Sequence, residues 1–170
     1  FSFTRAVILL AEHNNEGSVG FILNKPMAHD LSTFVPEISQ QFSVFEGGPV
    51  DQDRLYYIHS RSDSIPNSKS ISKNLFWGGD FDVIKNMINN GELSSADIKF
   101  FLGYSGWSSD QLKEEVKRKT WIVLDDDDKK ANISSSNDAT FWKSKMIRLG
   151  GHYAISVSYT HLRAHETLPY

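Results

Sequence analysis

The chain has 170 residues, and 39% of them are hydrophobic before its 11 glycines are counted, so we expect one folded domain and exclude disorder for the bulk of it. Its 18 Lys and Arg against 21 Asp and Glu give a net charge of -3, which supplies no positive field for nucleic acid. The absence of Cys excludes disulfides and thiol chemistry, and no apolar run reaches the roughly 18 residues of a membrane helix.

The first two predicted strands form a hairpin. Residues 6–11 (AVILLA) and 19–23 (VGFIL) are β-rich, and residues 13–17 (HNNEG) in the segment between them hold Asn and Gly, which tolerate positive φ. We therefore expect the two strands to pair as antiparallel neighbours. Pro26 ends the second strand, and Asp30 or Ser32 is expected to begin a short helix.

Three shorter strands and one clear helix follow. The strands are predicted at 43–46, 55–59 and 75–77, the first two on either side of a Gly-Gly-Pro turn. Asp80 is the predicted N-cap of the helix, apolar side chains repeat after it at helical spacing, and Gly91 supplies the left-handed exit.

The last third of the chain alternates strands and helices. Residues 98–102 (IKFFL) and 120–124 (TWIVL) predict two strands. Between them, Ser108 and Gln111 stand at the spacing of a capping box and predict a helix. A final helix is predicted over residues 137–149.

This order of elements predicts a single compact domain of mixed α/β (α+β) class, with a mixed sheet, hairpin strands and packed helices. We assign it to residues 1–155 and expect its native N-terminus to be missing, because a strand begins almost at once. Residues 156–170 show neither strand alternation nor a helical face. We expect them to be a non-native tail that does not pack on the domain.

Gly-rich turns at strand ends mark the candidate binding site. None of them matches a phosphate loop or a dinucleotide-binding pattern, and a glycine alone is more often part of a tight turn than of a site. Because neighbouring strands lie only about 4.8 Å apart, we expect four of the turns to converge on one pocket for a small molecule or protein partner. The expected lining is Asn24, Lys25, Gly47, Gly48, His59, Gly79, Asp80, Gly103, Tyr104, Ser105, Gly106 and Trp107.

No catalytic residue, metal or cofactor is assigned. Ser105 lies in the setting of a nucleophile elbow, but Trp107 stands where that motif needs a small residue. The histidines lack metal-ligand spacing, and His59 reads more simply as a packed, hydrogen-bonded side chain. A non-catalytic binding module is therefore our leading hypothesis. The alternative is a hydrolase or transferase that uses Asp80 or His59 as acid or base.

Taken together, segments spread over about residues 3–155 resemble the YqgE/AlgH family. The resemblance implies a compact α/β fold and a cytoplasmic bacterial protein, often labelled a transcriptional regulator, with no established enzymatic activity. Two departures are that the family pattern begins earlier than this chain and that the C-terminal tail does not match. The segments that carry the resemblance are 3–10, 12–14, 16–17, 20–26, 47–50, 55–59, 78–80 and 101–107 with Gln111, Leu112, Trp121, Trp142, Leu149 and Gly150.

Overall fold

The fold is known from a computed structural model, which describes residues 1–124, 133 and 139–150. The expected tail at 156–170 therefore lies outside the described residues. The strands are β1 (Ile8–Asn14), β2 (Gly17–Ile22), β3 (Pro26–Asp30), β4 (Ser43–Glu46), β5 (Val50–His59), β6 (Lys69–Ser72), β7 (Leu75–Trp77) and β8 (Ile98–Ser108). The helices are α1 (Leu31–Phe34), α2 (Phe81–Asn89), α3 (Gln111–Lys117) and α5 (Ala139–Leu149).

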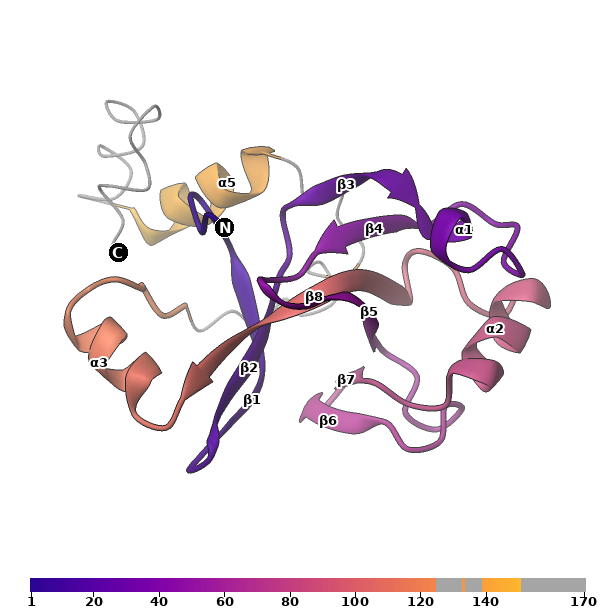
Figure 1. The fold of residues 1–170 in the computed structure, drawn as a ribbon, viewed down its shortest axis with the longest axis horizontal. Coiled ribbons are helices and arrows are strands. Elements are labelled where there is room, and N and C mark those ends of the chain that lie inside the picture. The colour runs from indigo at the N-terminus through magenta and orange to yellow at the C-terminus, as the bar shows by residue number, and fades with distance from the viewer. Residues whose placement is uncertain (125–132, 134–138, 151–170) are drawn as a thin grey trace.

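The strands form one sheet in the order β1-β2-β8-β5-β7-β6, with β4 added beside β8 and β3 beside β4 (Figure 1). The β4–β8 pairing is parallel, whereas the other pairings in this sheet are antiparallel. The predicted single domain of mixed α+β class, with a mixed sheet and packed helices, is confirmed. So is the predicted hairpin, because β1 and β2 pair antiparallel from Ile8 opposite Ile22 to Asn14 opposite Gly17.

Strand β8 is the centre of the sheet. Its first half pairs with β4 on one edge and with β5 on the other, and its second half pairs with β2. Side chains alternate along it, so that Phe100 and Leu102 enter one hydrophobic cluster while Phe101 enters the other. In the second cluster, the Phe101 ring stacks on Phe21 with the ring centroids 4.9 Å apart.

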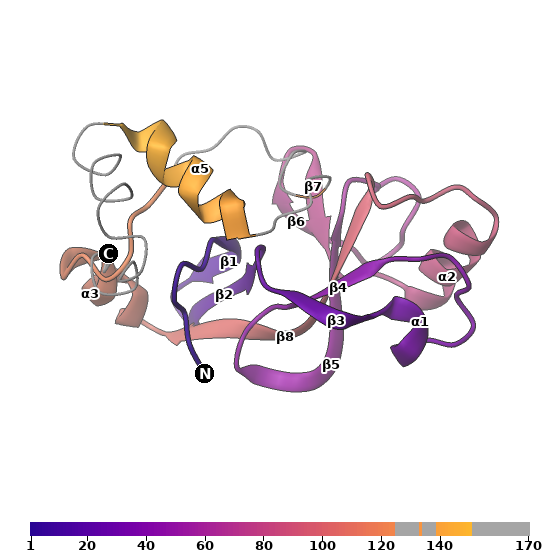
Figure 2. The same cartoon turned by 90° about the horizontal axis from the view of Figure 1, so that it is seen from above.

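The helices gather at opposite ends of the sheet. In Figures 1 and 2, α1 and α2 lie beyond one end of β8, whereas α3, α5 and the N-terminus lie at the other. The predicted caps are confirmed for two helices. The carboxylate of Asp30 accepts the N–H of Ser32 in the first turn of α1, and that of Asp80 accepts two N–H groups in the first turn of α2. Gly91 has a φ of +77° just beyond α2, as expected of a left-handed exit.

Two parts of the sequence reading are wrong, and both concern strands near α3. Strand β8 does not end at Leu102 but continues to Ser108, because the positive φ of Gly103 (+73°) lets the strand bend without ending. Residues 120–124 form no strand. This apolar run pairs with no strand and leaves Val123 72% exposed.

The structure also contains two strands that the sequence did not predict. Pro26, taken as the end of a strand, is the first residue of β3, an edge position where its missing N–H costs no ladder bond. Strand β6 is the polar run KSIS, which has too few β-forming residues to stand out.

Close backbone contact between the turn after β4 and β8 is expected to tolerate glycine alone. A Cβ on Gly48 would lie 2.1 Å from the carbonyl carbon of Tyr104, whereas a Cβ on Gly106 would meet only the movable Tyr104 ring at 3.2 Å. We expect Gly48→Ala to lower the free energy of unfolding by about 3 kcal/mol and the matched control Gly106→Ala by under about 1 kcal/mol. Urea unfolding of both variants measures the difference, and equal costs would contradict the packing argument.

Candidate functional site

The predicted binding residues separate into two groups. Around the second half of β8 lie Asn24, Lys25, Gly47, Gly48, Gly103, Tyr104, Ser105, Gly106 and Trp107, while His59, Gly79 and Asp80 lie beside its first residues. His59 pairs with Ile98, seven residues before Ser105. At about 3.3 Å per residue, His59 and Ser105 are roughly 20 Å apart along the strand. Of the two cavities described for this protein, neither is lined by members of both groups, and the shared pocket stays a prediction.

In the first group, the glycines serve contacts between backbones. The carbonyl oxygen of Gly47 accepts the Ile22 N–H at 2.9 Å and the Ser105 hydroxyl at 3.1 Å, and the Gly47 N–H donates to Leu102. Ser105 is fully buried inside β8, so it is neither in a strand-to-helix turn nor open to a substrate. Its hydroxyl fixes the turn after β4 against β8.

Asn24 and Lys25 hold the N-terminal segment. The Asn24 side chain accepts the Val7 N–H at 2.9 Å and donates to the Arg5 carbonyl at 2.8 Å. Lys25 donates to the Ser2 carbonyl and lies over the Phe1 ring. Burial lowers the pKa of Lys25, and the nearby Glu46 carboxylate opposes this shift. Both side chains thus order the first residues of the chain.

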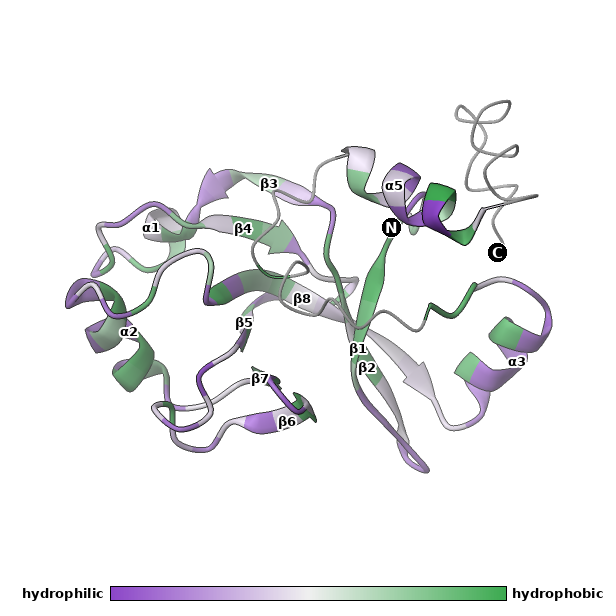
Figure 3. Ribbon diagram, turned by 180° about the vertical axis from the view of Figure 1, so that it is seen from behind, coloured by the Kyte–Doolittle hydropathy of each residue, from purple (hydrophilic) through white to green (hydrophobic). Residues whose placement is uncertain are grey.

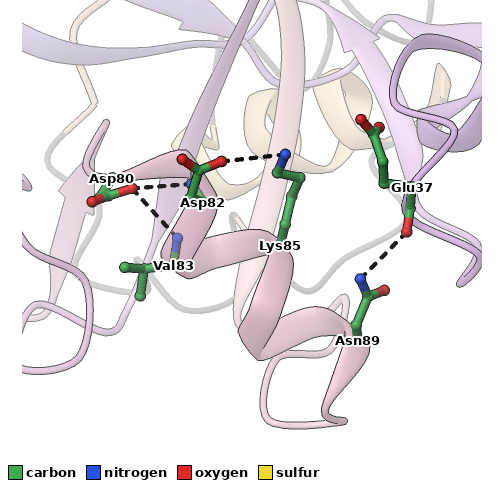
Figure 4. A network of polar contacts seen from close by, with 6 residues as sticks. All are labelled: Glu37, Asp80, Asp82, Val83, Lys85 and Asn89. Atoms are coloured by element: carbon green, nitrogen blue, oxygen red, sulfur yellow. Dashed lines mark hydrogen bonds and ion pairs between the residues drawn. The ribbon is translucent and has the colours of Figure 1, made fainter.

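The second group caps and closes the turn before α2. The Asp80 carboxylate accepts the N–H groups of Asp82 at 3.0 Å and of Val83 at 3.4 Å, while Asp82 pairs with Lys85 one turn further on (Figure 4). Tyr57 donates its hydroxyl to the Gly79 carbonyl at 2.7 Å. These are the contacts of a helix N-terminus, and they engage Oδ1 of the carboxylate that the alternative enzyme hypothesis would use.

His59 is fully buried, and its hydrogen bonds determine its tautomer. Nδ1 accepts the Arg61 N–H at 3.1 Å, so the ring proton is on Nε2, which donates to the Gly78 carbonyl at 3.0 Å. The Ser68 hydroxyl, also 3.0 Å from Nε2, donates to the Ile65 carbonyl at 2.8 Å. Because Nε2 carries a proton, it cannot accept one from Ser68, and this pair is not an activated serine.

A cleft of about 810 Å³ lies elsewhere, between the first ten residues, α3 and α5. Figure 3 shows hydrophobic residues along β1, along the segment after α3 and on α5. Of the predicted site residues, Gly106 and Trp107 line this cleft. Further lining residues, none of them in the predicted site, are Arg5, Leu9, Ser72, Glu115, Trp121, Val123, Trp142 and Met146.

Two polar atoms in the cleft lining are buried without a hydrogen-bond partner among the described residues, namely Arg5 Nε and Ser72 Oγ. Arg5 also has a φ of +54°, uncommon for a residue with a side chain, and its guanidinium lies 5.8 Å from the centroid of the Trp142 ring. Buried polar groups in proteins are normally satisfied, so two exceptions in one cleft call for an explanation. No sequence motif marks them, because Arg5 and Ser72 are far apart in the chain.

Lys99 is another buried group that the sequence reading did not single out. It lies on the same face of β8 as Phe101, and its Nζ is 3.9 Å from the centroid of the Phe45 ring. Burial lowers the pKa of Lys99 to about 7. It lines neither this cleft nor the polar pocket described below.

Within the described residues, no group of three or more His, Asp or Glu side chains could hold a metal ion. In the same part of the chain, no helix is long and apolar enough to cross a membrane.

Comparison with known proteins decides the family. The model of the AlgH-like family matches residues 1–154. The chain belongs to this family. It is 39% identical to a UPF0301 protein of Parabacteroides distasonis, over 92% of this chain and 80% of that relative, and 40% identical to one of Bacteroides thetaiotaomicron, over 89% and 77%.

Two solved structures have the same fold. The solution structure of the AlgH protein from Pseudomonas aeruginosa superimposes with a TM-score of 0.71 at 24% identity, covering 91% of this chain and 83% of that one. A crystal structure of a protein from Corynebacterium diphtheriae gives 0.67 at 17% identity, covering 88% and 80%. At these identities the likeness supports the fold alone.

His59 is expected to make stability depend on pH. Burial lowers the pKa of His59 and outweighs the opposing hydrogen bond to the Gly78 carbonyl, so the folded protein binds the proton at a lower pH than the unfolded chain, where His titrates near 6.5. As pH falls from 7 to 5, the unfolded state gains a proton that the folded state lacks, and the free energy of unfolding decreases by up to about 1.4 kcal/mol per pH unit.

Urea unfolding at pH 7, 6 and 5 measures this slope. The non-titrating variant His59→Gln should show a shallower slope than the native protein, whereas His29→Gln, at an exposed position on β3, should keep the native slope. An unchanged slope in His59→Gln would show that another group is responsible.

Proposed function

We propose that this protein is a non-catalytic binding module whose site is the cleft between the N-terminal segment, α3 and α5, and whose ligand is an apolar small molecule with an anionic group. The observation that carries the proposal is that two of the four buried side-chain atoms without a hydrogen-bond partner among the described residues, Arg5 Nε and Ser72 Oγ, line the same apolar cleft. A bound ligand would satisfy them. The cleft volume of about 810 Å³ is within the range of small-molecule sites.

The chemistry of the lining supports this ligand class. Trp107, Trp121 and Trp142 all line the cleft, and the rings of Trp107 and Trp121 meet edge to face with centroids 6.0 Å apart. Large aromatic surfaces favour an apolar or planar ligand body. Arg5 offers a charged donor for a carboxylate, sulfonate or phosphate, and its planar guanidinium suits such groups. Ser72 adds a hydroxyl that can donate or accept.

Enzymatic use of His59 and Asp80 has less support. A hydrolase needs an acid, a base or nucleophile, and an oxyanion donor within mutual reach. Here Asp80 caps α2 and His59 uses both ring nitrogens in hydrogen bonds to the backbone. The polar residues of the two Gly-rich groups are mostly engaged in holding the fold together. They support a binding protein more than a catalyst.

We further propose that ligand occupancy regulates a protein partner in the bacterial cytoplasm, which is the setting that the family resemblance implies. Residues 121–124 and α3 form a wall of the cleft and carry partly exposed apolar side chains, such as Val123 and Leu124. A ligand that packs against this wall changes a surface available to a partner. The net charge of -3 gives no support to a direct contact with DNA.

Two fluorescent probes of matched shape test the cleft. The anionic 8-anilinonaphthalene-1-sulfonate and the neutral N-phenyl-1-naphthylamine should both bind and quench tryptophan fluorescence. Arg5→Met keeps the apolar stem but removes the charge, so we expect it to weaken the anionic probe about tenfold and the neutral probe less than twofold. Fluorescence titration gives both dissociation constants.

The matched control is Arg54→Met, an exposed arginine on β5 outside the cleft, which should change neither affinity. Thermal melts confirm that the variants stay folded, since these probes also bind loosened proteins. Equal loss of both probes in Arg5→Met, or an equal effect of the control, would contradict a charged contact in the cleft.

Binding to DNA should be weak and sequence-independent. With a balanced charge, any affinity comes from a few phosphate contacts and falls steeply with salt. Fluorescence anisotropy with random and promoter-derived duplexes at about 150 mM salt should show no preference. Nanomolar binding to one operator would overturn this and support a direct regulator of transcription.

A further inference from the structure

A second, polar pocket lies between the tip of the β1–β2 hairpin and the corner where β8 leads into α3. Its volume is about 160 Å³, enough for a small ion with some water. It is separate in character from the apolar cleft, and Leu112 of α3 lines both. The lining is His13, Asn14, Asn15, Gly17, Ser18, Ser108, Ser109, Asp110, Leu112 and Lys113.

The hairpin register places a histidine and a serine side by side in this pocket. His13 of β1 is directly opposite Ser18 of β2, and their side chains meet with Nδ1 and Oγ 2.6 Å apart. Ser18 is only 5% exposed, whereas His13 is exposed. The short bond links a buried hydroxyl to an imidazole that can exchange protons with solvent.

Protonation of His13 reverses the direction of this bond. In the neutral ring, Nδ1 can accept the Ser18 proton, which leaves the hydroxyl with no proton to offer a ligand. In the imidazolium both ring nitrogens carry protons, so Nδ1 donates to Ser18 Oγ and the Ser18 proton is released for another acceptor. One protonation step therefore adds a positive charge to the pocket and frees a buried donor.

We propose that this pocket binds a tetrahedral oxyanion, a sulfate or phosphate group, together with a proton on His13. Lys113 supplies a permanent positive charge, and the hydroxyls of Ser18 and Ser109 are the neutral donors, while the Ser108 hydroxyl donates to Gln111 Oε1 at 3.3 Å. Asp110 is the one carboxylate in the lining and opposes the anion. Glu12 is paired with Lys69 at 3.6 Å, and Glu16 is on the exposed hairpin tip outside the lining. With His13 protonated, the lining carries two positive charges against one negative.

Nucleophilic catalysis by Ser18 is the rival use of the same pair, and the geometry supports it less. An activated serine needs a base that is itself held by a third group. Among the described residues, His13 Nε2 has no hydrogen-bond partner, and no pair of donors is seen converging beside Ser18. Hydroxyls and cations around a small cavity suit the binding of an anion without a reaction.

Sulfate is the sharpest probe, because its charge does not change between pH 8 and 6 and any pH dependence therefore comes from the protein. NMR titration of the full chain with sodium sulfate, at constant ionic strength, should show shifts at His13, Ser18 and Lys113. Histidine is the side chain that ordinarily titrates in this range, so we expect the dissociation constant to tighten about tenfold from pH 8 to pH 6.

Two variants and their controls separate site binding from general attraction. His13→Gln should abolish the pH dependence, and Lys113→Gln should weaken sulfate about fivefold or more at pH 6. The matched controls are His29→Gln on β3 and Lys117→Gln on α3, which lie outside the lining and should change nothing. No saturable shift at pH 6, an affinity that does not depend on pH, or equal losses in the controls would overturn the proposal.

Phenyl phosphate distinguishes a free ion from the phosphate group of a larger molecule. Binding at least as tight as that of sulfate, with the same sensitivity to Lys113→Gln, would assign the pocket to a phosphate monoester. Sulfate binding without phenyl phosphate binding would assign it to a free ion. Neither result depends on the apolar cleft. A failure of the polar pocket to bind oxyanions would therefore be independent of a failure of Arg5→Met to discriminate the two fluorescent probes.

Discussion

The close crossing of the turn after β4 over β8 is the contact on which the rest of the structure depends. At this point Gly47 donates to Leu102, accepts from Ile22 and accepts from the Ser105 hydroxyl. Gly48 faces the Tyr104 backbone with no room for a Cβ. Because three strands are joined within a few residues, any widening here would displace β2 and β5 as well as the turn.

The length of β8 determines which side chains and cavities can lie close together. Its eleven residues carry β4 and β5 at one end and β2 at the other, so the two ends of the strand, beside α2 and α3, are about 33 Å apart along it. His59 and Asp80 lie at the α2 end, while the cleft and the polar pocket both lie at the α3 end. With Leu112 lining both cavities, α3 is the element through which occupancy of one could influence the other.

Local signals predicted the elements whose residues have strong local preferences. The hairpin could be predicted because Asn and Gly separate two β-rich runs. Helix α2 could be predicted because Asp80 precedes an apolar helical repeat. Residues 103–107 were wrongly predicted to be a turn, because a glycine with positive φ occurs both in turns and in bends within strands. Only the pairing with β2 distinguishes the two cases. Residues 120–124 have strand composition, but whether such a run becomes a strand depends on a free sheet edge, which is a property of the whole fold.

Neither candidate cavity could be predicted from local sequence preferences, although the hairpin sequence determines one pair of residues in the polar pocket. Arg5 and Ser72 both line the cleft, but they are far apart in the chain, and no local sequence pattern connects them. His13 and Ser18, in contrast, follow from the hairpin itself: a two-residue turn that places Asn14 opposite Gly17 must also place His13 opposite Ser18. Reading the register outward from a confident turn would have found this pair.

The same comparison explains why the most recognisable motifs pointed away from the cavities. Glycine pairs and the polar residues beside them recur where backbones cross, since a crossing leaves N–H and C=O groups that a nearby side chain must satisfy. Asn24 does this for residues 5 and 7, Asp80 for the first turn of α2, and Ser105 for Gly47. A side-chain group that is used in a hydrogen bond to the backbone is less available to bind a ligand. Function is therefore better sought in polar atoms that line a cavity and that the fold leaves without a partner, or whose hydrogen bond can reverse, such as those of Arg5, Ser72 and the His13–Ser18 pair.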